Sequence, residues 1–379
     1  MRVELGLAVG IFLFAYPFII YPILLRIVAP RREEDAAREQ QHIELPSLAM
    51  VICAFNEAGV IGRKLENCLT LDYPKGRFRI IVISDGSIDT TAEIVSSYAG
   101  RGVELIEQRR RRGKVANLND VIPCLEEGIV VLSDANVFYD RNSLRRLTDK
   151  LWDPTVGCVS GKVILKNAEE ALRSTTDGYY SLEWALQEGG SRLHSMMGAD
   201  GAMYAVRRHL FQRCANDTVV EDFVIPMSVV RQGYRVVFQP EAIGWENGAT
   251  SIREEFRRKV RISAGAAQQL LRGPAWPGRA PVRVWFVFIS HKLLRWLSPL
   301  VAAATLIIAL SAPRSGVSQA VLAGSALLIA LALLRVITGS TRRVFEAPFY
   351  FVFGQIAIVL GLLRGVAGLQ PVMWAKVDR

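Results

Sequence analysis

The apolar residues of this 379-residue chain gather near its two ends. An almost unbroken apolar run covers Leu5–Leu25, and three more runs follow towards the C-terminus, at Ser298–Leu310, Val317–Ile337 and Ala347–Leu363. About 20 consecutive apolar residues are enough for a helix to span a bilayer. The pattern predicts one membrane-spanning helix within 1–29 and three within 298–379, the first of these being short unless it includes part of the segment before it.

Between these ends, short β-rich runs alternate with helical patterns. The expected strands are Ser47–Ala54, Arg79–Ser84, Val103–Glu107 and Ile129–Ser133, and the expected helices run from Asn56 to about Thr70, over Thr90–Tyr98 and over Lys114–Leu125. Strands that alternate with helices are typical of βαβ units on a parallel sheet. We therefore expect an α/β domain with a mainly parallel sheet, and ligands beyond the carboxyl ends of its strands.

The second half of the domain is less regular. It contains expected helices at Ala171–Ser195, Ile225–Gln232 and Arg253–Leu271, and expected strands at Met203–Arg207 and Arg235–Gln239. A Gly/Pro-rich break at Gly273–Arg279 follows. Val282–Leu297 then mixes Trp, His, Lys and Arg among apolar residues, as an interfacial helix does. This divides the chain into a soluble domain at 30–272, an interfacial helix at 273–297 and membrane helices at 298–379.

Basic residues set the expected orientation. Arg26, Arg31 and Arg32 follow the first apolar run, so the positive-inside rule places the domain in the cytoplasm of a multi-pass inner-membrane protein. A cleaved signal peptide is the alternative for Leu5–Leu25, but the run is long for one and no small-residue cleavage site follows. With four spans, both termini, including Lys376 and Arg379, would lie outside.

The charge distribution and the cysteines argue against a nucleic-acid-binding protein and against a zinc protein. The net charge is +10 and the pI is about 9.5, yet the basic clusters flank membrane segments and accompany no nucleic-acid-binding motif, so we expect no nucleic-acid partner. The five cysteines form no C-x-x-C pair, and they and the four histidines give no zinc spacing. Reduced, mostly buried thiols are expected.

Three acidic signatures carry the candidate chemistry. Asp85 and Asp134 each directly follow a β-rich run, the second within Ser133-Asp134-Ala135-Asn136, and Glu221-Asp222 opens a predicted helix. Oxygen ligands two residues apart suit a hard cation that bridges a diphosphate. Each signature taken alone is also explained by a turn or a helix N-terminus. Together they favour metal-assisted chemistry on a charged donor beside a membrane.

With these motifs the chain resembles the family 2 glycosyltransferases of GT-A fold, in the membrane-integrated branch that includes hyaluronan, cellulose and poly-N-acetylglucosamine synthases. The resemblance covers about Pro46–Leu271 and implies a Rossmann-like nucleotide-sugar domain. It implies that Ala54, Asn56, Glu57 and Asp85 hold the nucleotide base. It also implies that Asp134 and Asn136, in place of the family's D-x-D, hold Mg²⁺ or Mn²⁺. Lys114, in a G-K-x-x-x-L-N-like stretch, would meet nucleotide or phosphate.

The same resemblance implies the catalytic and acceptor residues. Val220-Glu221-Asp222 matches T-E-D, with Val220 where threonine is usual, and implies Asp222 as general base with Glu221 in support. Gly198, Asp200 and Gly201 would border the acceptor. In Arg258-Lys259-Val260-Arg261-Ile262, which stands where processive members have Q-x-x-R-W, Arg258 and Arg261 would meet the donor. Ile262 replaces the tryptophan on which an acceptor sugar stacks, which puts processive synthesis in doubt.

The sequence therefore predicts an inverting, metal-dependent transfer of a sugar, most simply from a UDP-sugar, to a lipid or growing glycan acceptor at the bilayer during exopolysaccharide or envelope-glycan synthesis. Partners in polysaccharide synthesis or export would fit this role. Alternatives remain open: a lipid glycosyltransferase that makes a single glycolipid, a transporter with a regulatory domain, and a non-catalytic subunit of an export complex. Product analysis distinguishes the lipid glycosyltransferase from a polymer synthase. Absence of turnover with every donor would indicate the non-catalytic subunit.

Overall fold

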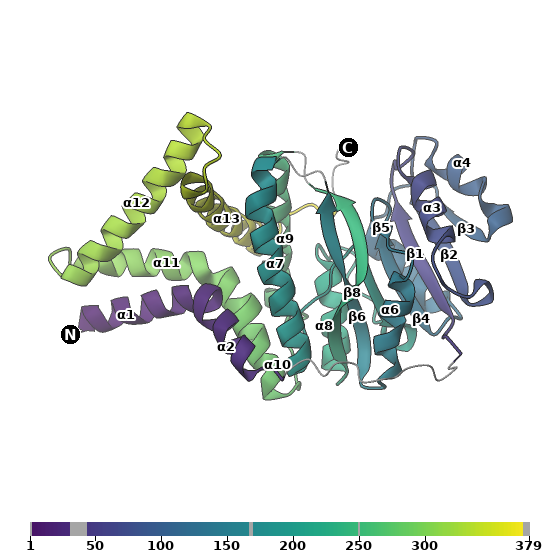
Figure 1. The fold of residues 1–379 in the computed structure, drawn as a ribbon, viewed down its shortest axis with the longest axis horizontal. Helices are drawn as coiled ribbons and strands as arrows, with labels where there is room; N and C mark the ends of the chain where they lie inside the picture. Colours follow the sequence, from purple (N-terminus) through teal and green to yellow (C-terminus); the bar gives the residue numbers. More distant parts are fainter. Residues whose placement is uncertain (1, 31–43, 167–169, 249–250, 374–379) are drawn as a thin grey trace.

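The computed structural model describes residues 2–30, 44–166, 170–248 and 251–373, and only the backbone of 170–179. Figure 1 shows an α/β domain with long helices extending from one side of it. The predicted orientation in the membrane involves Arg31, Arg32, Lys376 and Arg379, and these four residues lie outside the described part of the chain.

The domain is built on one eight-stranded sheet with the order β3-β2-β1-β4-β7-β6-β8-β5. Strands β3, β2, β1 and β4 are parallel to one another, as the βαβ pattern predicts, whereas β7 is antiparallel to both β4 and β6. The strands are β1 (Leu48–Ala54), β2 (Phe78–Asp85), β3 (Val103–Gln108), β4 (Ile129–Asp134), β5 (Phe138–Tyr139), β6 (Val156–Lys166), β7 (Met203–Arg207) and β8 (Arg235–Asn247).

Seven helices of the described domain flank or adjoin this sheet. They are α3 (Ile61–Leu69), α4 (Thr91–Ser96), α5 (Lys114–Val121), α6 (Ser143–Asp149), α7 (Glu170–Leu193), α8 (Glu221–Arg231) and α9 (Ile252–Arg272). The helix expected to open at Asn56 begins later, at Ile61, because Asn56 adopts a left-handed conformation (φ 55°). Helix α5 passes into a 3₁₀ turn at Ile122, because Pro123 interrupts its hydrogen bonding.

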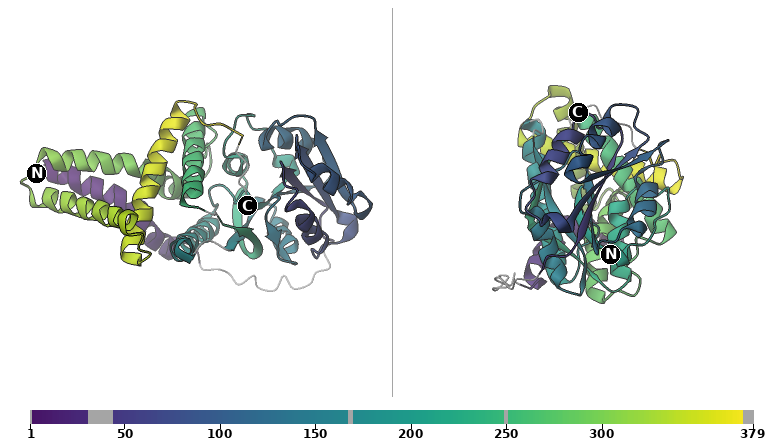
Figure 2. Two further views of the ribbon diagram at one scale, coloured as in Figure 1. Left: turned by 90° about the horizontal axis from the view of Figure 1, so that it is seen from above. Right: turned by 90° about the vertical axis from the view of Figure 1, so that its right-hand side faces the viewer.

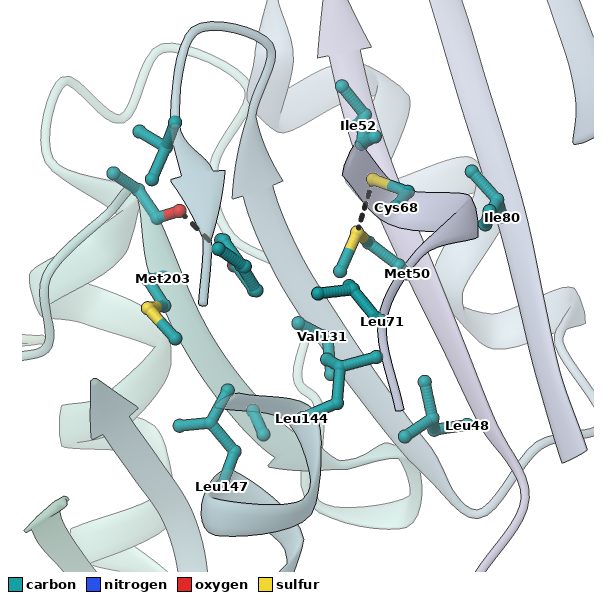
Figure 3. Packing of buried hydrophobic residues seen from close by; sticks show 14 of the residues in the cluster. Leu48, Met50, Ile52, Cys68, Leu71, Ile80, Val131, Leu144, Leu147 and Met203 are labelled. Carbon is teal, nitrogen blue, oxygen red and sulfur yellow. Dashed lines mark hydrogen bonds between the residues drawn. The ribbon is translucent and has the colours of Figure 1, made fainter. Parts of the chain in front are cut away.

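Alternation along the central strands separates two hydrophobic cores. Leu48, Met50 and Ile52 of β1 point into a core beneath α3 and α6, where the Cys68 thiol lies 3.5 Å from the Met50 sulfur (Figure 3). Ala49 and Val51 point to the opposite face, which α5 and α8 cover. Both faces of the parallel half are therefore buried, which explains why its strands are apolar almost throughout.

The remaining helices form the apolar part. They are α1 (Arg2–Ala15), α2 (Tyr21–Val28), α10 (Val282–Val287), α11 (Leu294–Ser311), α12 (Gly316–Thr338) and α13 (Arg343–Val366). Turns of π-helix join α1 to α2 and α10 to α11. Among the described residues, four helical runs are long and apolar enough to cross a membrane: Val3–Val28, Val282–Ser311, Gly316–Thr338 and Arg343–Val366.

The second of these runs differs from the expected division. An interfacial helix ending at Leu297 and a separate span beginning at Ser298 were expected, but the helix continues without a break from Val282 to Ser311. Pro299 falls within it without ending it. Polar residues that were expected at the membrane surface contact the domain: Glu183 of α7 lies 2.9 Å from His291 Nε2 and 2.8 Å from Arg295.

Helix α13 makes extensive contact with α9, the basic helix of the domain. Gly361 and Gly365 allow the two backbones to approach closely, since a Cβ on Gly361 would lie 2.5 Å from the Val260 carbonyl oxygen and one on Gly365 would lie within 2.5 Å of the Ala264 carbonyl oxygen. Two glycines four residues apart lie on one helix face, which is what close helix packing requires.

Candidate active site

Lys114 lies at the centre of the acidic signatures. Its ammonium group is 2.8 Å from Asp134 Oδ1 at the end of β4 and 3.0 Å from Glu221 Oε1 at the start of α8. Burial alone would lower the pKa of Lys114, but the two carboxylates outweigh it and hold the pKa well above its usual value. The structure thus brings together one predicted donor-binding residue, one predicted metal ligand and one predicted catalytic residue.

Asp85 positions the loop that carries Lys114. Its Oδ1 accepts the Arg112 backbone N–H at 2.7 Å, and its Oδ2 accepts that of Gly113 at 2.8 Å. Gly113 has a φ of 90°, which glycine adopts without strain, and α5 begins immediately after it. Asp85 therefore fixes the N-terminus of α5. Its role in binding the nucleotide base stays a prediction.

The loop after β1 is joined to the loop after β2. Asn56 Oδ1 accepts the Ile88 backbone N–H at 2.9 Å, and the Glu57 backbone N–H donates to Thr91 Oγ1 at 2.8 Å. Ala54 is buried at the end of β1, where it pairs with Ser84. These residues lie at the carboxyl ends of the parallel strands β1 and β2 and in the loops that follow. Their contact with a donor stays a prediction.

Asp222 lies against the Gly201 turn. A Cβ on Gly201 would be only 2.7 Å from Asp222 Oδ2, so the missing side chain makes room for this carboxylate. Burial, followed by the nearby charge of Glu221, raises the pKa of Asp222 to about 6. Burial also acts to raise the pKa of Glu221, but the positive charge of Lys114 outweighs burial, so the pKa of Glu221 is lowered. The pair thus contains one carboxylate held ionised and one with raised proton affinity, which suits a general base.

The turn after β4 carries the predicted metal ligands. Asn136 donates its amide N–H to Glu246 Oε1 of β8 at 2.9 Å, so its carbonyl oxygen points away from that carboxylate. Beneath the turn, the fully buried Lys64 ammonium donates to Ser133 Oγ at 2.9 Å and to the Val137 carbonyl. The turn is therefore held from below by a cation and from the side by a carboxylate.

These groups surround a small cavity of about 70 Å³. Its lining comprises Gly113, Lys114, Val115, Asp134, Gly201, Thr218, Val219, Glu221, Asp222, Arg261, Val372 and Met373. Binding pockets for small molecules usually measure roughly 300–1,000 Å³. The cavity has room for a phosphate or part of a sugar, and it is smaller than a whole nucleotide sugar.

Other predicted residues lie around this cavity without lining it. Gly198 packs against Phe223, and Asp200, with its backbone N–H bound to Ser160 Oγ, has a pKa raised to about 7 by burial. Arg258 is directed elsewhere, to the carboxylate of Glu255 and the hydroxyl of Tyr180. Of the two arginines predicted to meet the donor, only Arg261 lines the cavity.

Several residues of the site escape prediction from the sequence. Lys64, Glu246, Val372 and Met373 reach it from distant segments of the chain. A lysine in an otherwise apolar helical face, Ile61–Leu69, is the only signal that could have indicated Lys64. Nothing in the local pattern distinguishes the other three.

Replacing Gly201 by alanine should reduce the rate of turnover by about 10- to 100-fold, because the new methyl group must displace the Asp222 carboxylate and a shift of about 1 Å in a reacting group has effects of this size. Steady-state kinetics should show the loss in kcat with a nearly unchanged KM for the donor. Gly76→Ala, in open space on the same domain, is the matched control. Equal kcat values in the two variants would refute the close approach.

A protein-family model described as glycosyltransferase like family 2 matches residues 46–273. The chain belongs to this family. It is a family 2 glycosyltransferase with a GT-A-type fold, as the resemblance predicted, and its apolar helices associate it with a membrane.

The chain is also similar to curated relatives and to a solved structure. The chain is 26% identical over 240 residues to "Probable glycosyltransferase YdaM" of Bacillus subtilis and 27% identical over 240 residues to "Poly-beta-1,6-N-acetyl-D-glucosamine synthase" of Staphylococcus aureus. Each match covers 60% of this chain and 57% of the relative, so the chain spans little more than half the length of the relatives it matches. The fold is similar to that of a mannosyltransferase of Pyrobaculum calidifontis, solved with GDP-Man and Mn²⁺, at a TM-score of 0.71 and 21% identity, with 95% of this chain and 99% of that chain covered.

Proposed function

We propose that this glycosyltransferase moves a sugar from a nucleoside diphosphate sugar to a hydroxyl of a membrane-associated acceptor, with inversion at the anomeric carbon. The observation that supports this best is the juxtaposition of Asp222 with Lys114 and Arg261 around one cavity. Two cationic side chains suit a diphosphate. A carboxylate across from them suits the removal of the acceptor proton as its oxygen attacks the sugar opposite the leaving group.

The residues present fit a divalent metal ion. Asp134 offers a carboxylate and Asn136 a carbonyl oxygen, both of them hard donors, with the Glu246 carboxylate beside them. Among the described residues no three His, Cys, Asp or Glu are grouped as a dedicated metal cage. Mg²⁺ is usually bound through one or two carboxylates together with substrate phosphates, which is the kind of site that Asp134 and Asn136 could form. Such an ion would neutralise charge on the leaving diphosphate. The structural neighbour solved with Mn²⁺ supports this assignment.

The acceptor is proposed to come from the membrane side of the site. Phe223, next to Asp222, packs edge-on against Trp296 of α11 with the ring centroids 5.5 Å apart. The base is thus one residue away from a contact with an apolar helix. Ile262, 41% exposed on α9, offers no aromatic surface for a sugar, which favours the addition of one or a few sugars over a polymer.

The sequence suggests a UDP-sugar, whereas the similar mannosyltransferase was solved with GDP-Man, so the proposal leaves the donor open between uridine and guanosine nucleotides. The proposed site is also compatible with a lipid glycosyltransferase. The test is turnover by the purified protein in detergent, with UDP- and GDP-sugars, Mg²⁺ or Mn²⁺, and membrane lipids. Release of nucleoside diphosphate together with one discrete glycolipid is the expected result. A ladder of products would show that the aromatic residue is dispensable. No turnover and no nucleotide binding would indicate the non-catalytic subunit.

A further inference from the structure

Helix α13 is long and apolar enough to cross a membrane, but its C-terminal end lies beside the catalytic cavity. Only a few residues separate Val366, the last residue of the helix, from Val372 and Met373, which line the cavity together with Asp222. The end of α13 is therefore on the same side as the catalytic domain.

The course of α13 also keeps it beside the domain. Phe353 packs on Phe256 of α9 with the ring centroids 5.0 Å apart, and further along Gly361 and Gly365 contact Val260 and Ala264. The contacts advance along both helices in the same order, so α13 follows α9 for at least 13 residues, or about 20 Å. Helix α9 is rich in charged residues and carries Arg261 of the cavity, so it cannot lie in hydrocarbon.

The other apolar helices have a different direction. Helices α1 and α11 extend side by side away from the domain, and the turn between α11 and α12 lies at their far end (Figures 1 and 2). From that turn α12 runs back, inclined to the other two, to the start of α13 (Figure 1). Gly10 of α1 packs on Thr305 of α11 within this group. In both views α13 lies across these three helices, between their near ends and α9. Its start is held there by an ion pair between Arg335 of α12 and Glu346.

We propose that α13 does not cross the membrane but lies along the bilayer surface on the side of the catalytic domain. Three helices, Val3–Val28, Val282–Ser311 and Gly316–Thr338, then cross, and the N-terminus and the Val372–Met373 segment lie on opposite sides. This differs from the four spans expected from the sequence. It does not depend on the transferase activity.

The exposed side of α13 fits a lipid surface. Ile356, Leu360 and Leu363 are 49%, 40% and 62% exposed and recur at helical spacing on one face. The exposed Arg343 and Arg364 flank them near the two helix ends and can reach lipid phosphates. An interfacial helix normally needs a polar face towards water. Here α9 covers the other side of the helix, which explains how so apolar a sequence can lie at the surface.

The first test is the sidedness of single introduced cysteines in the full-length protein. Thr341→Cys and Leu369→Cys precede and follow α13, and Arg314→Cys lies in the turn between α11 and α12. Sealed vesicles are treated with a membrane-impermeant maleimide before and after permeabilisation, and mass spectrometry identifies the labelled sites. The native Cys124, exposed on the domain, marks the domain side in every sample.

Thr341→Cys and Leu369→Cys should follow the labelling of Cys124, and Arg314→Cys should show the opposite pattern. If Leu369→Cys instead follows Arg314→Cys, then α13 crosses the membrane and the proposal is wrong. Labelling of all four sites from one side would also overturn it, because the α11–α12 hairpin would then not cross.

The second test is contact with the bilayer surface. A fluorophore is placed at Leu360→Cys in a Cys124→Ser background, and quenching by lipids with a spin label near the headgroup is compared with quenching by lipids labelled deep in the chain. Shallow quenching should dominate at Leu360→Cys. At Leu327→Cys, on the exposed face of α12, deep quenching should dominate. Deep quenching at both positions, or none at Leu360→Cys, would contradict the proposal.

Discussion

Replacing Asp222 by asparagine should abolish sugar transfer, lowering kcat by roughly 10²–10⁴-fold, while nucleotide binding remains nearly intact. The amide has almost the shape of the carboxylate and keeps the contact with Gly201, but it cannot accept the acceptor proton, and a positioned base contributes a factor of this size. Transfer is measured by product formation, and nucleotide affinity by calorimetry. Asp217→Asn is the matched control, because its exposed ion pair with Arg272 should contribute little.

The pH dependence gives an independent check on this assignment. A base acts only when deprotonated, and burial raises the pKa of Asp222 to about 6. The kcat/KM of the wild-type enzyme should therefore fall as the pH drops through about 6, and a residual activity of Asp222→Asn should lack this step. If the variant keeps wild-type turnover, or if the acidic step survives in it, the base is another group.

Replacing Asp134 by asparagine should remove metal-dependent donor binding, weakening it by at least about 100-fold. The charge of the carboxylate would be lost next to Asn136, which has none to offer, and outer-shell partners alone account for 10–100-fold effects at metal sites. The measurements are Mn²⁺ binding by electron paramagnetic resonance and donor binding by calorimetry with and without chelator. Asp140→Asn, an exposed carboxylate on the same segment, is the control.

Two outcomes would contradict this prediction. Donor binding by the wild-type protein that is insensitive to chelator would remove the metal from the proposal altogether. Chelator-sensitive binding that survives in Asp134→Asn would move the metal to other ligands, with Glu246 as the first candidate because Asn136 already binds it. In either case Lys114 would keep its contact with Glu221, so the site should remain folded.

The sequence predicted the parallel half of the sheet because each strand there is a short apolar run with a turn at its end. It did not predict β6, since Gly157, Ser160, Gly161 and Lys162 interrupt the apolar pattern of that strand. The structure explains the glycines: a Cβ on Gly161 would lie 2.7 Å from the Met203 sulfur of the adjacent strand β7. The glycine that close packing requires thus interrupts the apolar pattern from which a strand is predicted.

The site shows the same limit. Asp85, Asp134 and Asp222 could be found because each lies at the end of a strand or the start of a helix, where local signals are strong. Arg258 was predicted to meet the donor because it stands in the segment that matches Q-x-x-R-W. In the structure it binds Glu255 and Tyr180, and the position of α7 that brings Tyr180 near depends on tertiary packing. Glu246 and Met373 join the site only through the three-dimensional fold.

The place of Val372 and Met373 in the cavity wall has a consequence for biogenesis. These residues are synthesised after every other described part of the site, and they follow α11, α12 and α13. A nascent chain that has made only the α/β domain would hold Lys114, Asp134 and Asp222 but would have an open cavity. We expect the finished active site to form only once α11 and α12 have been inserted into the bilayer and α13 has packed on α9, so that membrane insertion is the last step in assembling the site.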